Sequence, residues 1–118
     1  MEFNEVSYSG GIPVDGYGPG FFRVAGEVHR APILILPEGM VLWNGFGDAG
    51  PLQKTIGAVD VLFVGMGAEI APVPAHIREM LEAAGGPGLE VMASPTACRT
   101  YNVLLSEGRR VGLAALPV

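Results

Sequence analysis

Glycine and proline cut this chain into short apolar segments, and their spacing limits what it can fold into. The 118 residues include 18 glycines and 10 prolines, which are spread along the whole length. They interrupt the longest uncharged stretches, so no segment is suited to span a membrane as a helix. With 49% hydrophobic and 16% charged residues, the chain is also too apolar for intrinsic disorder. We therefore expect one compact domain over residues 1–118.

The first half of the chain has the pattern of two β-hairpins. Apolar segments at residues 21–24 and 27–29 flank Ala25-Gly26, and segments at 33–36 and 40–43 flank Pro37-Glu38-Gly39. Both connections contain residues that favour tight turns. This pattern predicts antiparallel strand pairing.

From residue 60 onward, strands alternate with helices. The apolar runs predict strands at 61–64, 89–92 and 110–115, and the helical spacing of apolar residues predicts helices at 74–84 and 94–106. Ser94 and Pro95 fit the N-cap and first turn of the second helix, and a shorter helix is expected within 52–59. The order predicts a small α/β domain, with antiparallel hairpins in the N-terminal half and a βαβαβ unit in the C-terminal half, around a central mixed sheet.

The charge and the cysteine count argue against several classes of function. Twelve acidic and seven basic residues give a net charge of −5, which opposes binding to a nucleic-acid backbone. One cysteine cannot form an intrachain disulfide, and the two distant histidines add no metal-ligand spacing, so we expect neither a metal nor another cofactor. The first residues carry Glu2 and Glu5 without a basic targeting signal, which favours a cytoplasmic protein with no direct membrane insertion. Pairing of a free sheet edge with a second copy is compatible with this composition.

Two glycine-rich segments resemble ligand-binding loops, but turns explain them better. Residues 45–50 match the G-x-G-x-x-G pattern of dinucleotide-binding proteins, yet Pro51 follows at once and the preceding strand belongs to a hairpin. Residues 16–20 could present backbone amides to an anion, but a strand follows them and supplies no helix dipole. Trp43 is interpreted as core filler or as one wall of a binding surface, and His29 and His76 as surface residues.

A candidate site lies where two strands of the βαβαβ unit end. Residues 64–67 close one strand, and residues 94–98 open a helix directly after the next. Ligands of open α/β sheets bind at such carboxyl ends, so we predict a crevice between the two segments. Its candidate binding residues are Gly65, Gly67, Ser94, Thr96, Cys98, Arg99 and Asn102. The sequence assigns no catalytic residue and no metal ligand.

Cys98 has two interpretations. The helix dipole and the neighbouring Arg99 could lower the pKa of its thiol and make it a nucleophile. A helical wheel instead places Cys98 on an apolar stripe, which favours a thiol in the core. Free cysteines are also among the residues most often buried. That stripe contains Ala97, Cys98, Tyr101, Leu104 and Leu105, and Leu104→Ala is expected to be strongly destabilising.

Over about residues 11–116, the sequence resembles the Mth-type domain family. The residues that carry the resemblance are Gly16-Tyr17-Gly18 with Gly20 and Phe22, Trp43, Val64-Gly65-Met66-Gly67, Met92, the specific stretch Thr96-Ala97-Cys98-Arg99-Thr100-Tyr101-Asn102 with Leu104, and Glu107-Gly108-Arg109-Arg110-Val111. The resemblance implies a compact α/β fold with a central sheet and no established catalytic activity. In the branch that includes respiratory complex I assembly factor 3, it implies a non-enzymatic helper in assembling a membrane-bound complex. Where members carry Gly-Thr-Gly at the strand end, this chain has Met66.

Two functional hypotheses follow. The first is a soluble, non-enzymatic interaction module, similar to the assembly-factor branch, with a protein partner that the sequence does not identify. The alternative is a small-molecule or anion-binding enzyme that uses the crevice between Gly65–Gly67 and the helix start at Ser94–Arg99. The reactivity of the Cys98 thiol distinguishes the two, because only the second needs a thiolate near neutral pH.

Overall fold

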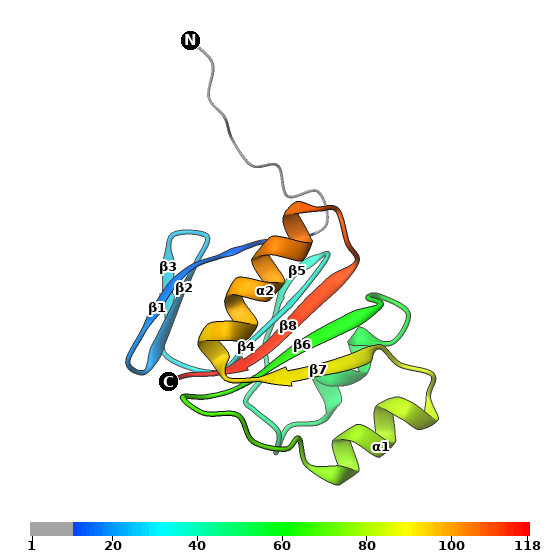
Figure 1. The fold of residues 1–118 in the computed structure, drawn as a ribbon. Helices are drawn as coiled ribbons and strands as arrows, with labels where there is room; N and C mark the ends of the chain where they lie inside the picture. The colour runs from blue at the N-terminus through cyan, green and yellow to red at the C-terminus, as the bar shows by residue number, and fades with distance from the viewer. Residues whose placement is uncertain (1–10) are drawn as a thin grey trace.

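Residues 11–118 of the computed structural model form two β-sheets and two α-helices (Figure 1). The smaller sheet has the strand order β1-β2-β3, and the larger has the order β5-β4-β8-β6-β7. A short 3-10 helix, η1, lies between β5 and β6. The elements are β1 Val14–Gly18, β2 Phe21–Val24, β3 Glu27–His29, β4 Ile33–Leu36, β5 Gly39–Val41, η1 Gly50–Thr55, β6 Val61–Met66, α1 Ala75–Ala83, β7 Gly88–Met92, α2 Ser94–Ser106 and β8 Val111–Leu116.

Both predicted hairpins are present. β2 and β3 pair antiparallel across Ala25 and Gly26, whose φ angles of 51° and 80° are those of a tight left-handed turn. The amide of Gly26 also donates a hydrogen bond to Asp15 Oδ2 at 3.0 Å, which ties this turn to β1. The second hairpin joins β4 and β5.

The βαβαβ unit winds in two directions along the larger sheet. β6 pairs in parallel with both β7 and β8. The chain steps outward from β6 through α1 to β7, and then returns through α2, past β6, to β8. Because parallel crossovers are almost always right-handed, steps in opposite directions place their helices on opposite faces of the sheet. Figure 1 shows this arrangement, with α2 across one face and α1 on the other.

Each face of the larger sheet has its own apolar core. Side chains alternate along β4, so that Ile33 and Ile35 join the core under α2, while Leu34 and Leu36 join the core on the α1 side. The central strands β6 and β8 are buried along most of their length, as expected of strands covered on both faces. The smaller sheet lies beside α2 and contributes further side chains to the same core (Figure 1).

Several details differ from the sequence-based expectation. β1 was not anticipated, because two of its five residues are glycines. β5 ends at Val41 rather than at residue 43, since Trp43 leaves the sheet to enter the core on the α1 side. The helix expected within 52–59 is the 3-10 helix η1, which starts two residues earlier and ends before Gly57. Finally, the N-cap of α2 is Ala93, and Ser94 is its first helical residue.

Candidate functional site

At the position of the predicted crevice, the end of β6 and the start of α2 are in direct contact. The amide of Gly67 donates to Ser94 Oγ at 2.9 Å, and the amide of Ser94 donates to the carbonyl oxygen of Gly67 at 2.8 Å. A Cβ atom at Gly65 would lie only 2.6 Å from Ser94 Oγ and 2.7 Å from Ser94 Cα. The missing side chain at Gly65 therefore allows the helix start to rest against the strand.

The Ser94 hydroxyl connects three elements. Besides accepting the bond from Gly67, it donates to the carbonyl oxygen of Leu116, the last residue of β8, at 2.5 Å. Ser94 is only 1% exposed, so these partners satisfy a buried polar group. The predicted N-cap role of Ser94 is wrong, because its side chain bonds to neighbouring strands and caps no amide of its own helix. A crevice at this junction, and a ligand-binding role for it, stay predictions.

Cys98 lies on the buried face of α2, one turn after Ser94. It is 3% exposed and packs in the core between α2 and the sheet. Burial raises the pKa of the Cys98 thiol to about 11, and the positive charge of Arg99 offsets only part of this rise. The core interpretation of the side chain is confirmed, and its surroundings favour the neutral thiol at neutral pH.

This environment predicts slow thiol chemistry. We expect iodoacetamide to alkylate Cys98 more slowly in the folded protein than in the urea-unfolded chain, with no thiolate inflection below the ordinary thiol pKa of about 8.5. The measurement is the alkylation rate as a function of pH, with the unfolded chain as its control. A folded-state inflection near neutral pH would restore the nucleophile interpretation.

The raised pKa of Cys98 also predicts a loss of stability in alkali. The unfolded chain releases the thiol proton near the ordinary thiol pKa of about 8.5, while the folded protein keeps it until its raised pKa of about 11. Between these values the folded state binds more protons, so the free energy of unfolding falls as pH rises. Urea denaturation across this range should show a smaller fall for Cys98→Ala, and an equal fall in both proteins would contradict the assigned thiol environment.

Two further side chains of α2 hold the start of the smaller sheet. Asn102 accepts a hydrogen bond from the amide of Val14 at 2.9 Å and donates one to the carbonyl oxygen of Val14 at 2.8 Å. Tyr101 donates its hydroxyl hydrogen to the carbonyl oxygen of Ile12 at 2.8 Å, and burial raises the pKa of this phenol. Asn102 thus bonds to β1 as a neighbouring strand would, so both ends of its amide already have partners within the protein.

Removing the Asn102 amide should weaken the attachment of β1. We expect Asn102→Ala to lower the free energy of unfolding by about 1–3 kcal/mol, because it leaves the amide and carbonyl of Val14 without their partner. Thr96→Ala, on the exposed side of the same helix, should change it by less than about 0.5 kcal/mol. Urea denaturation followed by the fluorescence of the single tryptophan compares the two, and equal effects would contradict the structural role of Asn102.

The seven candidate residues therefore fall into separate groups. Gly65, Gly67 and Ser94 meet at the junction of β6 and α2, while Cys98 and Asn102 continue along the inner face of the helix. Thr96 and Arg99 are exposed on its outer face, where Arg99 donates to Thr96 Oγ1 at 3.4 Å. The structure thus brings only the first three together.

The other sequence candidates occupy structural positions. Residues 45–48 form a turn in which the amide of Asp48 bonds to the carbonyl oxygen of Gly45 at 2.9 Å, and residues 16–20 form the end of β1 and its turn to β2. Trp43 is 2% exposed and stacks edge-to-face on Phe46 at 5.1 Å, as core filler does. Its Nε1 is buried and has no hydrogen-bond partner within residues 11–118. No group of three or more potential metal ligands occurs in this part of the chain.

Sequence reasoning missed a hollow between β3 and β5. Residues 28–32 and 40–44 line a space of about 440 Å³. Three of the lining side chains are apolar and exposed: Val28 by 43%, Met40 by 36% and Leu42 by 86%. Residues 40–43 were predicted as one strand, and nothing in this apolar segment indicates that the chain leaves the sheet after Val41 and exposes Leu42.

Comparisons with known proteins agree with this fold. The family model described as "Protein of unknown function (DUF498/DUF598)" matches residues 14–116. An uncharacterized protein of Rhodobacter capsulatus is 52% identical over 118 residues, which cover all of this chain and 94% of that protein. The NADH dehydrogenase [ubiquinone] 1 alpha subcomplex assembly factor 3 of Danio rerio is 28% identical over 92% of this chain and 66% of its own length. The solution structure of a Mth938-like domain protein from Bordetella pertussis superposes with a TM-score of 0.76 at 28% identity, covering 99% of this chain and 92% of that one.

The assembly-factor relatives are longer than this chain, which spans just under two thirds of the zebrafish protein and 60% of the human one. No helix within residues 11–118 has the length and apolar run needed to cross a bilayer. The family model nevertheless covers most of the chain, and the sequence likeness to the assembly factors extends over 92% of it for the zebrafish protein. The chain therefore belongs to the DUF498/DUF598 family, the Mth-type domain family that includes complex I assembly factor 3.

Proposed function

We propose that this protein is a non-enzymatic assembly factor, which binds a protein partner in the cytoplasm during construction of a respiratory NADH dehydrogenase. The observation that carries this proposal is its likeness to complex I assembly factor 3 over 92% of the chain. Those relatives are named for assembly, and their shared segment is the domain described above.

The chemistry of α2 supports an interaction role over catalysis. A cysteine nucleophile needs a thiolate and access to its substrate, whereas burial raises the pKa of Cys98 to about 11. The side chain of Ser94 is hydrogen-bonded to Gly67 and Leu116, and that of Asn102 to Val14, within the protein. Of the candidate residues, Thr96 and Arg99 are exposed on the outer face of α2, where a protein partner could contact them.

Deletion of the gene tests the proposal. In a host that has a respiratory NADH dehydrogenase, we expect loss of this protein to reduce the amount of fully assembled complex on native gels, together with NADH:quinone oxidoreductase activity of the membranes. Re-expression of the wild-type chain should restore both, and succinate:quinone oxidoreductase activity serves as the control for general membrane damage. Normal assembly in the deletion strain would overturn the proposal.

A further inference from the structure

The hollow between β3 and β5 lies at the free edges of both sheets. β3 ends the order of the smaller sheet and β5 ends that of the larger one, so within residues 11–118 each strand has one neighbour only. Residues of both strands line the same space of about 440 Å³. Building on the proposed assembly role, we propose that this groove binds an extended, apolar and acidic segment of the partner protein, which pairs with the free edge of β5.

Within residues 11–118, β5 pairs with β4 alone, so its other edge has no strand partner. A second hollow of about 430 Å³ also borders this strand; Met40 and Val41 line both spaces, and Glu38 and Lys54 add one charge of each sign to the second. A strand with unpaired amides and carbonyls is a template for an added chain, which gains affinity from backbone hydrogen bonds and specificity from alternate side chains.

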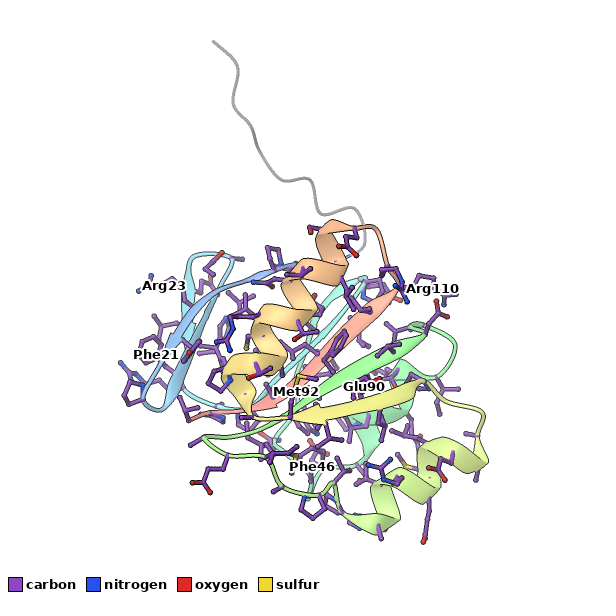
Figure 2. The ribbon with its side chains drawn as sticks, viewed as in Figure 1. Phe21, Arg23, Phe46, Glu90, Met92 and Arg110 are labelled. Carbon is purple, nitrogen blue, oxygen red and sulfur yellow. The ribbon has the colours of Figure 1, made fainter. Side chains whose placement is uncertain are left out.

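The opposite edge of the larger sheet, formed by β7, is less suited to pairing with an added strand. Figure 2 shows Glu90 and Met92 on β7, which forms that edge. Glu90 places an exposed charge in the middle of the strand, and such charges oppose edge pairing. β5 contains only Gly39, Met40 and Val41, with the 86% exposed Leu42 directly after it. The contrast favours β5 as the edge that receives a partner.

The groove offers apolar contacts to the added segment. Val28 of β3 and Met40 of β5 line the groove and are 43% and 36% exposed, and Leu42 extends the apolar surface beyond the strand. These are three of the six large hydrophobic side chains that residues 11–118 expose. An extended chain presents every second side chain to one face, so alternating apolar residues would match these walls.

Charge complementarity defines the rest of the partner. None of residues 28–32 and 40–44 is acidic, although the whole chain has a net charge of −5. Arg30 lies in the lining, and its guanidinium sits 5.6 Å from the centre of the Phe21 ring, which helps to hold it in place. No carboxylate of the described residues forms a salt bridge with Arg30. A guanidinium that pairs with none of the described carboxylates, beside an apolar groove, favours a segment that carries Asp or Glu.

Selection from a phage-displayed library of random peptides of strand length tests the groove directly. The wild-type protein should enrich peptides with alternating Val, Ile or Leu and at least one Asp or Glu, and their binding should shift amide resonances of β3 and β5. Leu42→Lys should weaken these peptides by at least about tenfold, while Val103→Lys, which changes an exposed apolar residue on α2, should not. Arg30→Glu should reverse the enrichment, in favour of peptides that carry Lys or Arg.

Several results would overturn the groove proposal. They are enrichment without acidic residues, resonance shifts away from β3 and β5, no enrichment at all, or equal binding by the Leu42→Lys protein. Light scattering measures the oligomeric state of both proteins. A wild-type dimer that becomes a monomer in Leu42→Lys would identify a second copy of this chain as the occupant instead.

Complementation of the deletion strain separates this proposal from the assembly role. If the wild type and Val103→Lys restore the NADH dehydrogenase while Leu42→Lys does not, both proposals are supported. If all three restore it, the assembly role stands and the groove proposal fails. If deletion causes no defect, the assembly role fails, and the peptide selection still decides whether the groove binds as proposed.

Discussion

Gly65→Ala should lower the free energy of unfolding by about 3 kcal/mol, because the added methyl group has no space. Its Cβ would lie 2.6 Å from Ser94 Oγ, 2.7 Å from Ser94 Cα and 3.0 Å from Ser94 Cβ. One of these atoms is backbone, so a change of rotamer cannot relieve the overlap. The start of α2 must shift away from β6, which also strains the pair of hydrogen bonds between Ser94 and Gly67.

Gly16→Ala is the matched control for this substitution. Gly16 is also a strand residue, but a Cβ there meets no atom within 4 Å and its backbone is in an ordinary conformation. Alanine at this position should be neutral or stabilising by up to about 1 kcal/mol. Urea denaturation measures both variants through the fluorescence of the buried Trp43. Similar stabilities for the two variants would contradict the close contact between β6 and α2.

Leu105→Ala should cost about 2–5 kcal/mol, the range for truncating a fully buried leucine. Leu105 is 0% exposed in the core that α2 shares with both sheets. Leu104 only packs against the rim of that core and is half-buried. The strong effect expected at Leu104 from the helical wheel therefore belongs to its neighbour, and Leu104→Ala should cost only about 1 kcal/mol.

This pair of adjacent leucines keeps composition and helix propensity constant. Any difference between Leu104→Ala and Leu105→Ala must come from where each side chain points. Thermal and urea denaturation should rank Leu105→Ala as clearly less stable. The reverse ranking would mean that α2 is rotated relative to the sheet.

The elements with strong periodic signals were predictable from the sequence. α2 ends at Ser106 as predicted and starts one residue before the position that a Ser94 N-cap would give, because apolar residues repeat at helical spacing and Gly108 follows its end. β6 was found from its apolar run, although it continues through Gly65 and Met66. Glycine ordinarily weakens a strand, and only the contact with Ser94 explains its presence there.

Elements that depend on distant partners were not predictable. β1 reads as a turn-rich segment in isolation, and its strand conformation relies on pairing with β2 and on Asn102, which lies 88 residues away along the chain. Trp43 was predicted at a strand end, but its ring packs in the core on the α1 side, with its edge-to-face contact to Phe46. Both outcomes are decided by tertiary packing, which local propensity does not contain.

Part of the candidate site was predictable from strand order and helical geometry, and part was not. Parallel strand order explains why the end of β6 and the start of α2 meet, and the structure brings them together. The inward and outward directions of Cys98 and Arg99 followed from helical geometry. The groove between β3 and β5 did not, because it is formed by the edges of two separate sheets and no residue pattern marks a sheet edge.

Complementation with Cys98→Ala tests most directly whether this protein works through its surface while α2 buries its thiol. The variant and the wild type are expressed at equal levels in the deletion strain, and the NADH:quinone oxidoreductase activity of the membranes is measured. Circular dichroism first establishes that the variant is folded. We expect the two proteins to restore activity equally. A folded Cys98→Ala protein that fails to restore it would show that the sulfur takes part in the function.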